Sequence, residues 1–195
     1  MISHAMTHIP SLSSLHSRFN LTLPATHPTM PWRGGAQAAV LIPLVNRPEP
    51  TLLLTQRALH LRHHPGQIAF PGGRAEAQDR SPIYTALREA QEETGLPPAN
   101  AEIWGCLPAL STVSGYQVTP VVALIEPPFT LSADHNEVAG IFEIPLAALM
   151  NPHHYQALRF WRKHKLHTVY AISVQKKFIW GVTAAIMRNL MLQIA

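Results

Sequence analysis

Two neighbouring segments decide how this chain is interpreted: Phe70-Pro71-Gly72-Gly73 and Arg88-Glu89-Ala90-Gln91-Glu92-Glu93-Thr94-Gly95. The paired glycines permit positive φ angles and let a ligand approach the main chain closely. Ser81 is a favourable N-cap, Pro82 fits the first helical position, and Gly95 is a common helix terminator. We therefore predict a glycine loop followed by a helix that begins after Ser81 and ends before Gly95.

The acidic residues of this helix are placed where they cost stability. At about 100° per residue, Glu89, Glu92 and Glu93 fall within roughly a 100° arc. They also lie in the last turns, where the helix dipole is negative and each anion costs about 0.3–1 kcal/mol. A bound Mg²⁺ ion, which prefers oxygen ligands, would relieve this repulsion. A solvated acidic face is the alternative, and the helix alone does not decide between them.

Composition limits the class of protein. The chain has 195 residues, of which 47% are hydrophobic and 13% charged, which indicates one globular domain and excludes disorder for most of its length. No apolar run approaches the roughly 20 residues that span a bilayer. Because Cys106 is the single cysteine, an intrachain disulfide is excluded and a reducing cytoplasm is expected.

The net charge of +4 is unevenly distributed, since every acidic residue lies between Glu49 and Glu143. Basic flanks favour an anionic partner or serve general solubility, and the sequence leaves both possibilities open.

The order of elements predicts an α/β (α+β) fold with a mixed sheet sandwiched between helices. We expect an N-terminal arm over residues 1–34 with a short helix, and a domain over 35–195 whose core spans about 36–150. Further strands and a closing helix follow from apolar runs and turn residues. The predicted strands cover residues 36–45, 51–57, 67–70, 101–107, 118–125 and 170–174, and the closing helix covers 178–192.

The glycine loop and acidic helix together strongly resemble the Nudix box of the Nudix hydrolases. That family cleaves nucleoside diphosphates linked to another moiety, and its loop–helix–loop box binds Mg²⁺ or Mn²⁺. The segment Arg88–Gly95 fills every defined position of R-E-x-x-E-E-x-G, and Leu96 supplies the apolar residue that follows. The first carboxylate of the usual pattern is replaced by Asp79, which is shorter and displaced. We assign Asp79 no metal role, and Glu76 could bind the metal in its place. Alternatively, either acid could pair with Arg88.

A second resemblance narrows the branch. The segment from Leu53 to Gly73 fills every defined position of L-L-T-x-R-[SA]-x₃-R-x₃-G-x₃-F-P-G-G, a signature of the coenzyme A pyrophosphatases. This resemblance implies hydrolysis of coenzyme A to 3′,5′-ADP and 4′-phosphopantetheine by attack of water on phosphorus.

The resemblance also implies roles for individual residues. Metal ligands would be Glu89, Glu93 and Glu92, and the cofactor Mg²⁺ or Mn²⁺. The general base would be Glu92 or Glu137, with Arg88 beside the catalytic groups. Substrate contacts would come from Arg57, Arg62, Gly72 and Gly73.

Other functions stay open alongside this one. They are hydrolysis of ADP-ribose or another nucleoside diphosphate derivative, a non-catalytic nucleotide-binding module, and an RNA-binding protein. We interpret His60, His63 and His64 as solvent-facing, and the basic run 161–165 as a solvated loop. We therefore expect a small-molecule substrate, no nucleic acid and no membrane partner, and either a monomer or a homodimer.

Overall fold

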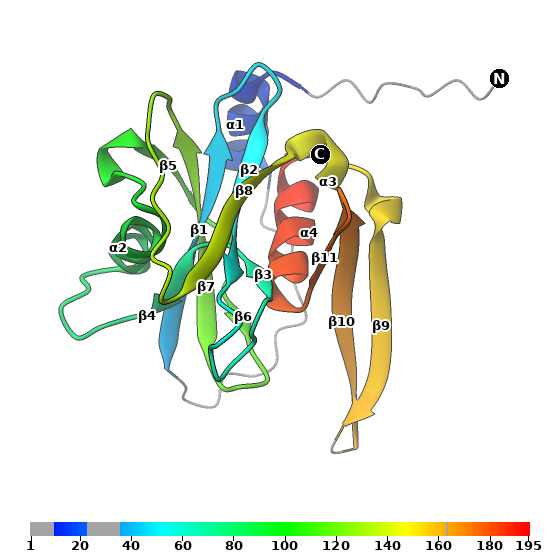
Figure 1. Cartoon of the computed structure of the whole chain (residues 1–195). Helices are drawn as coiled ribbons and strands as arrows, with labels where there is room; N and C mark the ends of the chain where they lie inside the picture. Colours follow the sequence, from blue (N-terminus) through cyan, green and yellow to red (C-terminus); the bar gives the residue numbers. More distant parts are fainter. Residues whose placement is uncertain (1–9, 23–35, 163) are drawn as a thin grey trace.

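A computed structural model describes residues 10–22, 36–162 and 164–195, and its elements form a central mixed sheet with helices on both faces (Figure 1). The strands of this sheet are β1 Gln37–Val45, β2 Thr51–Arg57, β3 Ile68–Ala69, β4 Gly72–Arg74, β5 Ala101–Cys106, β6 Leu110–Ser111, β7 Gln117–Ile125 and β8 Val138–Pro145. The helices are α1 Leu12–Leu21, α2 Pro82–Thr94, α3 Leu146–Leu149 and α4 Val182–Ile194, and short 3₁₀ turns span Pro98–Asn100 and Pro152–His154. A second, three-stranded sheet contains β9 Tyr155–Arg162, β10 Lys165–Val174 and β11 Lys177–Trp180.

The centre of the large sheet is the parallel pair β1–β7, which stays in register from Gln37 opposite Gln117 to Val45 opposite Ile125. The remaining pairs are antiparallel, including β1 with β2, β1 with β4 and β2 with β8. The prediction of a mixed sheet is therefore confirmed, as are strands close to their predicted limits at β1, β2, β5 and β7.

The two faces of the sheet bury different side chains because strand residues alternate in direction. In β2, Leu53 packs in the core beneath α2, whereas Leu52 and Leu54 pack in the core on the opposite face, beside α4. All three are fully buried. Helix α2 is thus fixed against the strands that carry the glycine loop, which brings its acidic end to that loop.

The ends of α2 follow from its sequence as predicted. The Ser81 hydroxyl accepts a hydrogen bond from the Tyr84 N–H at 3.2 Å, and Pro82 occupies the first turn, where its missing N–H costs nothing. Gly95 ends the helix with φ +69°, a left-handed conformation that favours glycine.

The C-terminal region differs from its prediction. The strand expected over 170–174 is the end of the longer β10, and Phe178 belongs to β11 rather than to a helix. Gly181, with φ +73°, ends that strand and starts α4 at Val182. Of the basic run 161–165, which we expected to be a solvated loop, Trp161 and Arg162 end β9 and Lys165 begins β10, so these residues belong to a hairpin, while residue 163 lies outside the described residues. Exposed strands of mixed composition give no clear period, which is why the sequence pattern missed them.

Helix α1 from the N-terminal arm packs on α4 through buried Leu15 and Phe19. The Gln193 amide of α4 donates to the main-chain oxygens of Phe19 at 2.8 Å and Thr22 at 2.6 Å. No helix in the described part of the chain is long and apolar enough to cross a membrane.

An ion pair joins the turn after β1 to β8 and makes stability depend on pH. The Arg47 guanidinium donates to both Glu143 oxygens, at 2.7 and 3.2 Å, and this lowers the pKa of the Glu143 carboxyl. A carboxyl with a depressed pKa stabilises the fold above its unfolded pKa, and that contribution is lost as the pH falls through the folded value.

We therefore expect Glu143→Gln to lower the free energy of unfolding by about 0.5 kcal/mol at about pH 7, since the pair is partly exposed and solvent weakens it. The difference should vanish at a second, acidic pH below the lowered folded-state pKa of Glu143, where the carboxyl is protonated in both states. Urea unfolding at the two pH values measures it, and an equal difference at both would contradict the electrostatic origin.

Candidate active site

The acidic end of α2 lies over β4, so that Glu93 meets the glycine loop directly. The Gly72 N–H donates to Glu93 Oε2 at 3.2 Å, and only 5% of Glu93 is exposed. The pKa of the Glu93 carboxyl is raised to about 8, mainly by burial and also by the charges of Glu89 and Glu137, while the Gly72 amide and the charge of Arg57 oppose the shift. A buried carboxylate surrounded by other acids is a position suited to a cation.

Each glycine of the loop has a different steric reason to be there. A Cβ on Gly73 would lie 2.5 Å from Glu89 Oε2, so a side chain would displace that carboxylate. A Cβ on Gly72 would collide with the main chain of Ala39 and Val40 in β1, the strand with which β4 pairs. Gly73 therefore leaves room for an acidic side chain, whereas Gly72 lets two strands approach.

Arg88 connects the acids of the helix to the loop before it. Its Nη1 donates to Glu92 at 2.8 Å, and its Nη2 donates to Glu89 at 3.0 Å and to the Arg74 carbonyl at 3.1 Å. Its Nε and Nη2 also donate to the two oxygens of Asp79, at 3.1 and 3.0 Å. The guanidinium therefore restrains Glu89 and Glu92 while it stays bound to a third acid, Asp79, whose side chain is buried.

Asp79 is the buried anchor of this arrangement. Beside Arg88, its Oδ2 accepts hydrogen bonds from the Glu76 N–H and the Thr85 hydroxyl, both at 2.9 Å. Arg88 is the largest of the influences that hold the pKa of the Asp79 carboxyl well below its usual range. Since both of its oxygens accept hydrogen bonds, Asp79 is the acid that pairs with Arg88. Glu76, the other acid considered for this pairing, contributes only its backbone N–H, which donates to Asp79.

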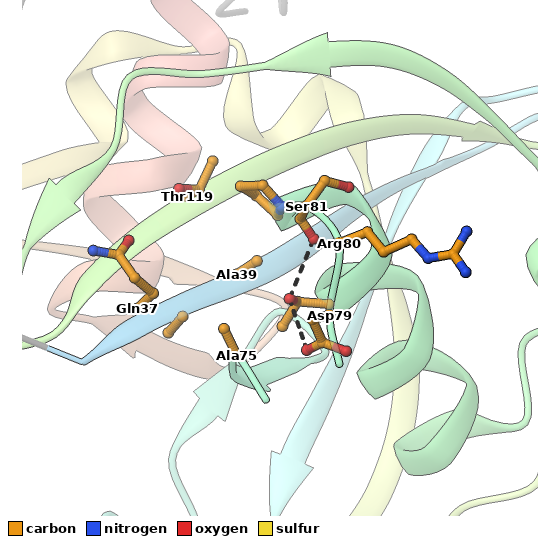
Figure 2. A pocket seen from close by; sticks show the side chains of 10 residues that line it. Gln37, Ala39, Ala75, Asp79, Arg80, Ser81 and Thr119 are labelled. Carbon is orange, nitrogen blue, oxygen red and sulfur yellow. Dashed lines mark hydrogen bonds between the residues drawn. The ribbon is translucent and has the colours of Figure 1, made fainter. Parts of the chain in front are cut away.

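Asp79 also borders a hollow of about 250 Å³ between β1 and the start of α2 (Figure 2). Gln37, Ala39, Ala75 and Thr119 line its other walls, and Arg80 points away from it (Figure 2). Among the described residues that line this hollow, the one basic side chain is Arg80, so they direct no cation toward a phosphate there. A second hollow, of about 430 Å³, is bordered by residues 74–78 and Glu89 and adjoins the acidic end of α2.

The remaining candidate acids occupy different environments. Burial raises the pKa of Glu89, with Arg88 opposing and the charges of Glu92 and Glu137 adding to the increase. Glu137, on the loop before β8, is exposed and near enough to act on both Glu89 and Glu93. Glu92 is more open than Glu89, with 58% of its side chain exposed, and binds Arg88.

These donors fit a hard divalent cation such as Mg²⁺ or Mn²⁺. Glu89 and Glu93 both border the glycine loop, their charges repel each other, and Glu93 forms no ion pair among the described residues. Across the described ranges, no three His, Cys, Asp or Glu side chains already stand close enough to complete a metal site. Ion binding would therefore require one side chain to shift, and Glu92 can do so by leaving Arg88.

The two candidate arginines differ in their relation to the acids. Arg57, half-buried at the end of β2 next to a register shift, lowers the pKa of Glu93 through its charge and is thus near it. Arg62 is exposed on the loop between β2 and β3, and no contact in the described structure joins it to the acids. The structure thus places Glu89 and Glu93 beside the glycines, with Arg57 and Glu137 close enough to act on Glu93 through their charges.

The NUDIX domain family matches residues 35–174, a span that contains the glycine loop, α2 and Glu137. The chain belongs to the Nudix family. Its Nudix box is therefore the loop at Gly72 and Gly73 together with α2, whose acids are described above.

Relatives in this family are close over the full length. The chain is 49% identical over 185 residues to the uncharacterized Nudix hydrolase NudL of Salmonella newport, which covers 94% of this chain and 95% of that relative. The NudL of Salmonella heidelberg gives the same identity and coverage. A MutT/nudix family protein from Enterococcus faecalis shares the fold, with a TM-score of 0.52 at 15% identity over 94% of this chain and 74% of that one. As a Nudix hydrolase, the protein acts on a diphosphate substrate.

Two parts of this Nudix site were not anticipated from the sequence. One is the hydrogen bond from Gly72 to Glu93, which depends on how β4 meets α2. The other is the turn from Asp134 to Glu137, whose Asp-x-Asn pattern is typical of a side-chain-supported turn and could have been recognised. His60 is exposed as expected, yet its ring contacts this turn.

The two glycines should respond differently to alanine. Gly73→Ala should leave the thermal unfolding midpoint near the wild-type value, because the flexible Glu89 side chain can move, but should weaken Mn²⁺ binding about tenfold or more. Gly72→Ala should lower the free energy of unfolding by about 2 kcal/mol or more, because its clash is with backbone.

Calorimetric titration with Mn²⁺ and thermal unfolding separate these effects. Equal metal affinity in wild type and Gly73→Ala would show that Glu89 is not a ligand.

Proposed function

We propose that this Nudix hydrolase cleaves the diphosphate of coenzyme A and its derivatives to 3′,5′-ADP and 4′-phosphopantetheine or its acyl or oxidised form. One observation carries the proposal. A single continuous signature, from Leu53 to Gly73, supplies both the glycines beneath Glu89 and Glu93 and the Arg57 cation beside them. It resembles the coenzyme A pyrophosphatase signature at every defined position.

The fold explains why the signature residues occur in this order. Leu53 and Leu54 anchor β2 on both faces of the sheet. The loop that follows closes back on the strand, because the Arg57 N–H donates to the Gln67 carbonyl at 2.9 Å and the Gly66 N–H donates to the Arg57 carbonyl at 3.1 Å. Gly66 has φ +70°, which favours glycine. The chain then reaches β4 and the site.

The charges of coenzyme A match this arrangement. Its diphosphate requires cations, its 3′-phosphate requires basic donors, and its pantetheine arm is neutral. We assign the 3′-phosphate to Arg57, with Arg62 on the adjoining loop as a second contact, since guanidinium groups bind phosphate through two parallel hydrogen bonds.

A divalent cation held by Glu89 and Glu93, with Glu92 as a further ligand, would supply charge neutralisation at the diphosphate and a more acidic bound water. Gly72 orients Glu93 through its N–H, and Arg88 orients Glu89. We favour Glu137 over Glu92 as the general base that takes the proton of the attacking water. Glu92 is neutralised by Arg88, whereas Glu137 accepts no side-chain hydrogen bond among the described residues.

The decisive experiment is mass analysis of products after incubation with coenzyme A and Mg²⁺ in ¹⁸O-labelled water. The wild type should yield 3′,5′-ADP and 4′-phosphopantetheine, one of them carrying a single ¹⁸O, and excess EDTA should abolish turnover. Hydrolysis of ADP-ribose without hydrolysis of coenzyme A would refute the proposal and indicate a different Nudix substrate.

Glu93→Gln should reduce kcat at least about 100-fold, because a metal ligand is lost, while the unfolding midpoint stays equal or rises as repulsion is relieved. Glu102→Gln, at an exposed acid of β5 away from the site, is the matched control and should behave as wild type. Full activity of Glu93→Gln would refute the metal assignment.

Arg57→Ala should raise KM for coenzyme A about tenfold and for 3′-dephospho-coenzyme A by less than about twofold, because only the former offers the 3′-phosphate. Arg80→Ala, which removes an arginine that points away from the neighbouring hollow, should change neither value. Steady-state kinetics on both substrates measure this, and equal increases would remove the 3′-phosphate contact.

A further inference from the structure

The turn that carries Glu137 is built almost entirely from its own hydrogen bonds. The N–H groups of Glu137 and Val138 donate to the Asp134 carbonyl at 2.9 and 2.8 Å. The backbone N–H and side-chain amide of Asn136 both donate to Asp134 Oδ1 at 2.9 Å. These bonds fix the shape of the turn but not where it sits relative to the acids of α2.

Its position is set by two neighbouring segments. On one side, the Asp134 N–H donates to the main-chain oxygen of Glu93 at 3.1 Å, which ties the turn to the C-terminal end of α2. On the other side, the Ala58 N–H donates to the Glu137 carbonyl at 2.8 Å, at the point where the chain leaves β2. The turn therefore lies between the Nudix box helix and the loop that follows Arg57.

His60 adds the only described side-chain contact from that loop to the turn. Its Nε2 lies 3.0 Å from the Asn136 carbonyl oxygen, and because a carbonyl can only accept, the ring must donate. Asn136 directly precedes Glu137. Together with the Ala58 bond, the ring holds two consecutive carbonyls of the turn, so that the backbone at Glu137 cannot rotate freely.

We propose that His60 is a positioning residue, which holds the Asn136–Glu137 peptide so that the Glu137 carboxylate faces the attacking water. The inference rests on the proposed function insofar as Glu137 acts as the base. It adds a residue whose side chain touches neither phosphate nor metal.

The test compares three single variants with coenzyme A as substrate. His60→Ala should lower kcat about 10- to 100-fold with KM changed by less than about twofold, since a misplaced base slows chemistry and not binding. His60→Gln, whose side-chain amide can donate from a similar position, should recover most of kcat. His63→Ala, an exposed histidine of the same loop without a described side-chain partner, should match wild type.

A double-mutant comparison separates positioning from general damage. In a Glu137→Ala background, His60→Ala should cause no further loss of kcat, because the group it positions is gone. An additive loss, or a wild-type kcat for His60→Ala, would overturn the inference. Failure of the wild type to hydrolyse coenzyme A would instead refute the proposed function, and the same variants could then be compared on the diphosphate that is cleaved.

Discussion

The site depends on one constraint: several carboxylates must share a small space beside a glycine loop without a cation from the chain to neutralise them all. Glu93 is buried, is held by a single backbone N–H, and stands near two further acids. Within the described structure, the available guanidinium of Arg88 is divided among Asp79, Glu89 and Glu92. The described chain therefore leaves an excess of acidic groups that a divalent ion would neutralise, at the end of a helix held by its packing on β1 and β4.

Arg88 has a structural logic of its own. Hydrogen bonds to the buried Asp79 side chain hold the guanidinium in place. The same guanidinium donates to Glu89 and Glu92 and so restrains both acids. The displaced first acid of the Nudix box is explained in this way. Asp79 holds the arginine that positions Glu89 and Glu92, two of the proposed metal ligands.

Much of the architecture was predictable because it is encoded locally. Ser81, Pro82 and Gly95 define α2, and uninterrupted apolar runs define β1 and β7. The strands of the second sheet could not be predicted in the same way, because their exposed residues follow no simple hydrophobic period.

The sequence supplied candidate site residues, whose roles stay predictions, but it indicated their geometry only in part. Spacing placed Glu89 and Glu93 on one helix, yet the Arg88–Glu92 bond and the position of Glu137 arise from tertiary packing. Distances between segments far apart in the sequence, such as His60 and Asn136, depend on the whole fold and leave no local signal.

The parallel pairing at the heart of the sheet has a consequence for biosynthesis. Gln37 and Gln117 are neighbours in space but eighty residues apart in the chain. During translation, β1 therefore emerges long before the strand that completes it, and contacts of such long range form slowly. Until β7 has left the ribosome, one edge of β1 stays open, and an unpaired strand edge of this kind is prone to pair with other chains.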